Sequence, residues 1–214
     1  MHATTSTNHS EPIGLPPSKR TRNWRWRVVD IVIASVIAVA AGVIFWAWDQ
    51  ASNPIGAPIQ AALPGLQGII NGPWLFAGVL GGLIVRKPGA ALYVELVAAT
   101  VSALMVTQWG ALTLLSGLVQ GLGAELVFAV FLYARWNWFV ALLAGAGAGI
   151  AESILDLLVW YPGAKFSFAV IYAISTTVSG LVIAGLGSWL IVKALAKTGA
   201  LNRFAAGRES RTSV

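Results

Sequence analysis

Four acidic residues lie deep inside long apolar stretches of this sequence: Glu95, Glu125, Glu152 and Asp156. No Lys or Arg shares those stretches, so no side chain of opposite charge is available to neutralise them locally. A charged side chain in an apolar medium is costly, and carboxyl groups in such positions commonly accept hydrogen bonds or positive charge from a ligand. The alternative is a protonated carboxyl that bonds to the backbone or to Gln120. Both interpretations stay open, for Glu95 and Glu125 in particular.

Aromatic residues gather near one set of ends of the apolar stretches. They include Trp46, Trp109, Trp160 and Tyr161. An aromatic belt at a membrane surface accounts for some of them. Close to Glu152 and Asp156, the same rings would also suit a flat, cationic heterocycle. Aromatic faces attract its charge, and carboxylates accept hydrogen bonds from ring amino groups.

Several other chemistries lack their residues in this chain. It has no cysteine, and its two histidines, His2 and His9, precede the first apolar stretch. No Walker A, HExxH or GxSxG sequence occurs. P-loop ATP hydrolysis, zinc-dependent proteolysis and serine hydrolase chemistry are therefore excluded. We predict a protein that is not an enzyme and that carries no metal or other cofactor.

Six apolar stretches must position the candidate residues. They run approximately over Val28–Trp48, Pro73–Val85, Pro88–Val106, Leu112–Tyr133, Trp138–Trp160 and Phe166–Val192. A membrane-spanning helix needs about 20 residues, so the second stretch must borrow residues from Ile69–Trp74. The chain is 57% hydrophobic and only 10% charged, whereas soluble domains are about 25% charged. We predict an all-α integral membrane domain of six transmembrane helices over residues 24–197.

The basic residues predict the orientation of these helices. Thirteen of the 14 Lys and Arg residues flank alternate ends of the stretches, and the other connections carry only Lys165. Because basic residues stay on the cytoplasmic side, both termini are predicted to be cytoplasmic. Residues 1–23 are predicted to be a disordered cytoplasmic tail, and residues 198–214 a basic cytoplasmic tail. The first stretch exceeds the 7–15 apolar residues of a signal peptide, which favours an uncleaved helix.

The same charge pattern bears on partners and on the outer surface. The excess of positive charge is explained by the membrane and its anionic lipids, so no nucleic-acid partner is implied. On the outer side, the first connection, Gln50–Gly72, is long and holds three prolines, yet it is rich in Ile and Leu. We predict that it folds back as a short helical lid over the outer face, because long structured loops are commonly functional.

Six short stretches resemble one family of membrane proteins. They are Trp26–Val32, Phe45–Trp48, Leu63–Gly68, Trp74–Gly78, Glu95–Ala99 and Gln120–Phe128. Together with the six helices and the extended first outer connection, they resemble the substrate-binding S components of energy-coupling factor (ECF) transporters. Within these, they resemble the YkoE-type branch for thiamin and hydroxymethylpyrimidine. The resemblance covers roughly residues 26–208, and the stretch Gln120–Phe128 is its most specific part.

The resemblance implies a subunit in the plasma membrane of a prokaryote that captures a vitamin or its precursor outside the cell. It implies a thiamin-like ligand, a transmembrane coupling subunit and two ATPase subunits as partners. The residues it suggests for the aminopyrimidine are Glu95, Gln120 and Glu125, with Gln67, Asp156 and the outer aromatic residues Trp46, Trp109, Trp160 and Tyr161 around them. Ala34 and Ala38, continued by Gly42, become the predicted partner-facing strip of the first helix, since small residues permit close approach of another helix.

Two other functions remain open from the residues alone. One is a stand-alone secondary carrier that uses the buried carboxyl groups. The other is a membrane scaffold in which those groups only stabilise the packing. A carrier moves its substrate in vesicles without an ATPase, whereas a scaffold binds no small molecule.

Overall fold

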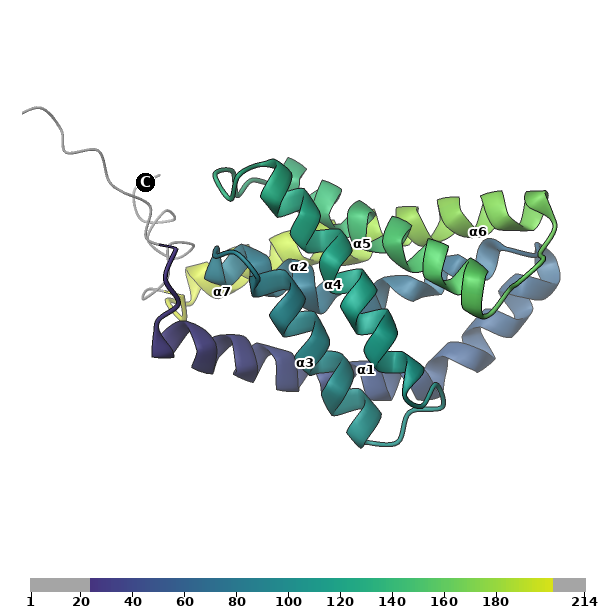
Figure 1. The fold of residues 1–214 in the computed structure, drawn as a ribbon, viewed down its shortest axis with the longest axis horizontal. Coiled ribbons are helices and arrows are strands. Elements are labelled where there is room, and N and C mark those ends of the chain that lie inside the picture. The colour runs from purple at the N-terminus through teal and green to yellow at the C-terminus, as the bar shows by residue number, and fades with distance from the viewer. Residues whose placement is uncertain (1–23, 202–214) are drawn as a thin grey trace, which may run out of the picture.

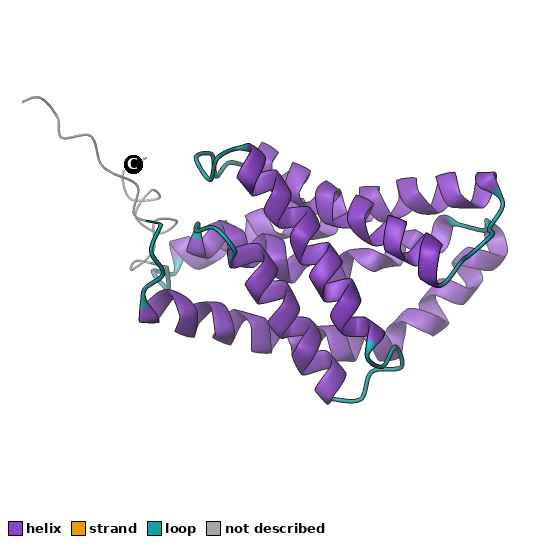
Figure 2. Ribbon diagram, in the orientation of Figure 1, coloured by secondary structure: helices purple, strands orange, loops and turns teal. Residues whose placement is uncertain are grey.

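The structure, a computed structural model, describes residues 24–201. The predicted tail 1–23 and all but the first four residues of the predicted tail 198–214 lie outside this range. Within it, the regular elements are all helices, joined by short connections (Figure 2). The all-α prediction is confirmed for this part of the chain.

The first helix is much longer than its apolar sequence suggests. Helix α1 spans Val28–Ala62, 35 residues, and continues through Pro54 and Pro58 (Figure 1). The predicted folded-back lid over Gln50–Gly72 is therefore wrong in its first half. Both prolines lie on the exposed side of the helix, so the carbonyl groups that lose a backbone N–H partner are not enclosed in the bundle. At about 1.5 Å per residue, α1 is about 52 Å long, so its last turns extend beyond a hydrocarbon core of about 30 Å.

After a turn at Gly65, the chain forms the short 3-10 helix η1, Leu66–Asn71, and then α2, Gly72–Val85. Gly65 has a φ of +100°, which glycine adopts without strain. Together, η1 and α2 make a 20-residue apolar span whose side chains are mostly buried. The prediction that the second span recruits residues before Trp74 is thus confirmed, and α2 is the central helix of the bundle.

The remaining helices surround α2. They are α3 (Ala90–Leu104), α4 (Leu112–Val130), α5 (Trp138–Val159), α6 (Phe166–Ser179), the π-helical segment η2 (Gly180–Gly187) and α7 (Ser188–Lys197). The last three form one continuous span, Phe166–Lys197. Among the described residues, five helical spans are long and apolar enough to cross a membrane. At 15 residues, α3 is shorter, so a sixth crossing and the orientation of the bundle stay predictions.

The small residues of α1 pack inside the bundle. Ala34 and Ala38 have no exposed surface, and Gly42 is buried with them against α3. A Cβ atom added at Gly42 would lie 2.6 Å from both the Ala98 carbonyl oxygen and the Val101 Cβ. The predicted partner-facing strip of Ala34, Ala38 and Gly42 is therefore corrected. These residues are small because α1 and α3 approach each other closely, not because a partner docks there.

The two ends of the bundle differ in chemistry. One end, here called the basic end, carries the α2–α3 turn with Arg86 and Lys87, together with the start of α1. Lys87 forms an ion pair with the buried Asp30, and Trp26 Nε1 donates to the Pro88 carbonyl oxygen at 3.0 Å. The hydrogen bond from Arg27 to Asp30 raises the pKa of the guanidinium. The opposite end, here called the aromatic end, holds the cavity described next.

Candidate functional site

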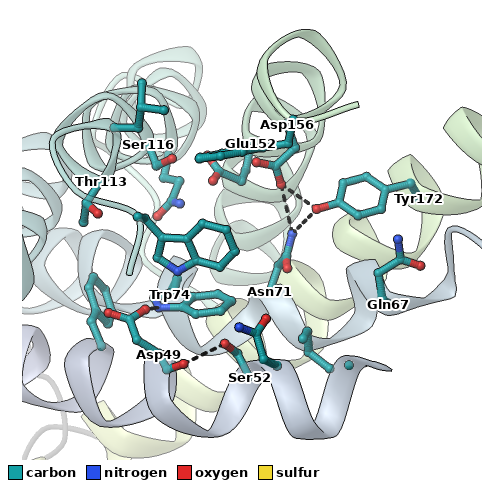
Figure 3. A pocket seen from close by; sticks show the side chains of 18 of the residues that line it. Asp49, Ser52, Gln67, Asn71, Trp74, Thr113, Ser116, Glu152, Asp156 and Tyr172 are labelled. Carbon is teal, nitrogen blue, oxygen red and sulfur yellow. Dashed lines mark hydrogen bonds between the residues drawn. The ribbon is translucent and has the colours of Figure 1, made fainter. Parts of the chain in front are cut away.

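A cavity of about 460 Å³ opens at the aromatic end, between α1, η1, α2, α4 and α5. This volume lies within the range of roughly 300–1,000 Å³ that is typical of small-molecule sites. Its polar and aromatic lining consists of Phe45, Asp49, Ser52, Asn53, Gln60, Gln67, Asn71, Trp74, Trp109, Thr113, Ser116, Gln120, Glu152, Asp156, Trp160, Tyr161 and Tyr172. Figure 3 shows many of these side chains converging from different helices.

The α1 side of the cavity centres on Asp49. Its Oδ1 atom accepts from Trp74 Nε1 at 2.9 Å, and its Oδ2 atom accepts from the Ser102 hydroxyl at 3.1 Å. Ser52, one turn later, donates to the Asp49 carbonyl oxygen at 3.0 Å (Figure 3). Asp49 is only 2% exposed. It therefore forms a fixed, buried acidic group that also orients the Trp74 ring.

The α5 side presents two acidic groups one helical turn apart, Glu152 and Asp156, and both are buried. Asp156 Oδ2 accepts from the Tyr172 hydroxyl at 2.6 Å and from Asn71 Nδ2 at 3.2 Å (Figure 3). The Asn71 amide also reaches the Tyr172 oxygen at 2.9 Å. This triangle ties α5 to α6 and to the end of η1. It fixes Asp156 in place, because two donors from separate elements hold the same oxygen.

Three polar atoms of the lining have no hydrogen-bond partner although they are fully buried: Gln67 Nε2, Thr113 Oγ1 and Glu152 Oε2. Gln67 Oε1 accepts from the Gly65 backbone N–H at 2.8 Å, which leaves the amide nitrogen as the free end. A buried polar atom without a partner costs about 1–3 kcal/mol. The three atoms belong to side chains that line the cavity but are themselves covered, so each needs a small side-chain movement to bond to a bound molecule.

The aromatic rings form a chain across this end of the bundle. Trp48 contacts Trp74, Trp74 contacts Trp109, and Trp109 contacts Trp160, each edge to face, with centroid separations of 6.4, 6.4 and 5.3 Å. Trp74, Trp109 and Trp160 line the cavity. Such rings provide flat apolar walls and a negative π face for a cation.

The cavity has a one-sided charge. Among the described residues that line it, three are acidic and none is Lys, Arg or His. No group of three or more His, Cys, Asp and Glu side chains in the described part of the chain could hold a metal ion. The site is therefore suited to an organic molecule that is neutral or positively charged and that donates hydrogen bonds.

Six of the predicted ligand-binding residues line this one cavity: Gln67, Trp109, Gln120, Asp156, Trp160 and Tyr161. Three others, Trp46, Glu95 and Glu125, do not. Glu95 is 1% exposed and its Oε2 atom accepts from the Gly78 backbone N–H of α2 at 2.5 Å. Its Oε1 atom has no partner. It lies in the packed interior between α2 and α3.

Glu125 lies at the basic end and accepts hydrogen bonds at the start of α3. Its donors are the backbone N–H groups of Gly89, Ala91 and Leu92, at 2.6, 2.9 and 3.3 Å, and the Tyr133 hydroxyl at 2.7 Å. The first N–H groups of a helix have no partner within it, so Glu125 caps α3 from the neighbouring α4. Burial, reinforced by the bond to Glu125, raises the pKa of Tyr133.

Several other residues that line the cavity were not predicted from the sequence. Asp49 lies directly after the apolar stretch Val28–Trp48 and is not among the predicted ligand-binding residues. Its place directly after Phe45–Trp48 is the signal that could have identified it. Asn71, Thr113, Ser116 and Tyr172 carry no such signal, because Ser, Thr, Asn and Tyr are common in helices and turns. Only the fold brings them together.

Comparisons with known proteins identify the family. The family described as "ABC-type cobalt transport system, permease component" matches residues 29–151. The "Putative HMP/thiamine permease protein YkoE" of Bacillus subtilis (strain 168) is 36% identical over 188 residues, covering 86% of this chain and 92% of that protein. A solved structure described as an S-component of an ECF transporter superposes with a TM-score of 0.81 at 34% identity, covering 88% of this chain and 95% of that one. The chain belongs to this family, as an ECF S component of the YkoE type.

The resemblance seen in the sequence is thus confirmed. This S component is a multi-pass membrane protein of a prokaryote and a subunit for transmembrane transport. Its cavity at the aromatic end is its candidate ligand-binding site. The roles of individual residues in that cavity remain predictions.

Proposed function

We propose that this S component captures thiamin or its hydroxymethylpyrimidine precursor in the cavity at the aromatic end. The observation that carries the proposal is a cavity with acidic and aromatic walls, whose lining side chains include three buried atoms without a partner, Gln67 Nε2, Thr113 Oγ1 and Glu152 Oε2. The name of the Bacillus subtilis relative, which includes HMP and thiamine, supports the same ligand class.

The chemistry of an aminopyrimidine complements these atoms. Its exocyclic amino group is a donor that Glu152 Oε2 can accept, and its ring nitrogens are acceptors for an amide such as Gln67 Nε2. Thiamin adds a cationic thiazolium ring, which the tryptophan faces and the acidic groups favour. Hydroxymethylpyrimidine would use the hydrogen-bonding atoms but less of the aromatic wall. Thiamin therefore fits the whole cavity better.

The orientation of the protein follows from the same proposal. The aromatic end with the cavity faces outward, and the basic end, with Arg86, Lys87 and Arg135, faces the cytoplasm of a prokaryotic cell. The bundle then crosses the plasma membrane six times, with α3 as the short crossing. Asp30 and Lys87, which pair at the basic end, lie at the inner surface.

Active uptake requires energy that this chain does not supply through any P-loop sequence. We propose that a transmembrane coupling subunit and two ATPase subunits provide it, as expected for an ECF S component. The buried Ala34, Ala38 and Gly42 are not offered as their contact.

A titration of the purified protein with a vitamin panel tests the capture step. Thiamin should quench tryptophan fluorescence saturably with a stoichiometry of one, hydroxymethylpyrimidine should bind more weakly, and biotin and riboflavin should not bind. Binding of none of the panel would contradict the proposal. Proteoliposomes that contain this chain alone should bind thiamin without accumulating it. Accumulation driven by a proton gradient in those vesicles would instead establish a secondary carrier that uses Glu152 and Asp156.

A further inference from the structure

The charge of the cavity walls bears on which forms of the ligand can enter. Acidic groups approach the cavity from two helices, Asp49 from α1 and Glu152 and Asp156 from α5. All three are at least 94% buried. No Lys, Arg or His occurs among the described residues that line the cavity. A negatively charged ligand group would therefore find no counter-charge there, whichever way round the ligand lies.

We infer that this cavity selects against phosphate esters, so that the S component takes up the free alcohol and rejects the phosphorylated form of the same molecule. This inference rests on the proposed function, because thiamin and hydroxymethylpyrimidine both carry a hydroxyl group that can be esterified. The specificity-determining residues are Asp49, Glu152 and Asp156, which act through charge and not through shape.

The conclusion does not depend on how many of the three carboxyl groups are protonated. An ionised carboxylate repels the phosphate directly, and like charges in contact at a buried site cost several kcal/mol. A protonated carboxyl can donate one hydrogen bond, but it leaves the charge of a buried dianion without compensation, which is also strongly unfavourable. Specific phosphate sites instead use Arg, Lys or backbone N–H groups at a helix start. Among the lining residues, the only buried side-chain N–H donor without a partner is Gln67 Nε2.

Competition binding on the purified, full-length protein tests this inference. Thiamin and hydroxymethylpyrimidine are each compared with their monophosphate esters, with tryptophan fluorescence as the readout. We expect each ester to bind at least ~100-fold more weakly than its alcohol. The matched control is the methyl ether of hydroxymethylpyrimidine, which adds bulk at the same oxygen without charge and should bind within about tenfold of the alcohol. An ester within tenfold of its alcohol would overturn the inference.

Two further outcomes separate charge from other causes. If the ether is rejected as strongly as the ester, size and not charge discriminates, and the inference is wrong. In the double variant Glu152→Gln/Asp156→Asn, which removes whatever negative charge this pair carries, the ratio of the ester to the alcohol dissociation constant should fall by about tenfold. An unchanged ratio in the double variant would contradict the assigned residues. Failure of both the alcohols and the esters to bind the wild-type protein would overturn the proposed function, and this inference with it.

Discussion

The sequence and the structure assign different roles to Glu125, so a substitution there can distinguish between them. Its place in the apolar stretch Leu112–Tyr133 suggested a ligand contact, whereas the structure places it on the start of α3, away from the cavity. Replacing Glu125 with Gln keeps the shape and one acceptor oxygen. It removes the charge and turns an amide N–H₂ group toward at least one of the backbone donors Gly89, Ala91 and Leu92.

The size of the effect can be worked from these contacts. A buried donor left without an acceptor costs about 1–3 kcal/mol, and the remaining bonds lose the strength that a charged acceptor provides. We expect Glu125→Gln to lower the free energy of unfolding by about 2–4 kcal/mol. For a protein of this length, each kcal/mol corresponds to roughly 2–4 °C, so the melting temperature should fall by roughly 4–16 °C.

Thermal unfolding in detergent and thiamin titration on the same sample provide the assay. The melting temperature should fall, while the dissociation constant for thiamin should change by less than about threefold, which is about 0.6 kcal/mol. Tyr133→Phe serves as the control, because it removes one donor to Glu125 Oε1 and leaves the three backbone bonds intact; its melting temperature should fall less. A Glu125→Gln protein of unchanged stability that has lost thiamin binding would refute the capping assignment.

Three further predictions concern packing, the cavity and the orientation. Gly42→Ala should lower the free energy of unfolding by about 1–3 kcal/mol, because the added Cβ would lie 2.6 Å from the Ala98 carbonyl oxygen and the Val101 Cβ. The melting temperature measures this loss, and Ala40→Leu on the exposed side of α1 is the control. An equal fall in melting temperature in the two variants would contradict the α1–α3 packing. Tyr172→Phe should weaken thiamin binding roughly tenfold by releasing Asp156, and unchanged affinity would show that this contact is dispensable. The chain has no cysteine, so an introduced cysteine is the one thiol that a maleimide can label. In whole cells, an impermeant maleimide should react with Ala164→Cys at the outer surface and should not react with Ala134→Cys at the inner surface. The reverse labelling pattern would contradict the proposed orientation.

The sequence predicts the fold well where apolar length decides it. The long apolar stretches each become helices, and Glu152 and Asp156, which have no basic residue near them in the sequence, are both buried. The end of α1 was not predictable in the same way. Pro54 and Pro58 signal a break in most helices, but here they lie on the exposed side of a helix whose other face packs on the bundle. Tertiary packing overrides the local preference.

The candidate site was predictable only in part, because burial alone does not say what a group faces. Glu95, Glu125 and Glu152 look alike in the sequence, each an acidic residue between small and apolar neighbours. In the structure one accepts from a backbone N–H of α2, one caps α3 and one lines the cavity. The surroundings of each carboxyl depend on which neighbouring helix packs against it. The pattern of apolar residues along one helix does not show which neighbour that is. Likewise, Ala34 and Ala38 face α3 because of the way the helices cross.

The matched pair Glu152→Gln and Glu95→Gln tests the central claim most directly. Both substitutions replace a fully buried carboxyl by an amide of the same shape, but only Glu152 lines the cavity. Thiamin titration of both purified variants should show roughly tenfold weaker binding for Glu152→Gln, because the amide places an N–H₂ group where the ligand needs an acceptor, and a hydrogen bond left unmade at a buried site costs about 1–3 kcal/mol. Glu95→Gln should bind as the wild-type protein does. Unchanged affinity in Glu152→Gln, or a loss confined to Glu95→Gln, would contradict the account of this cavity as the vitamin site.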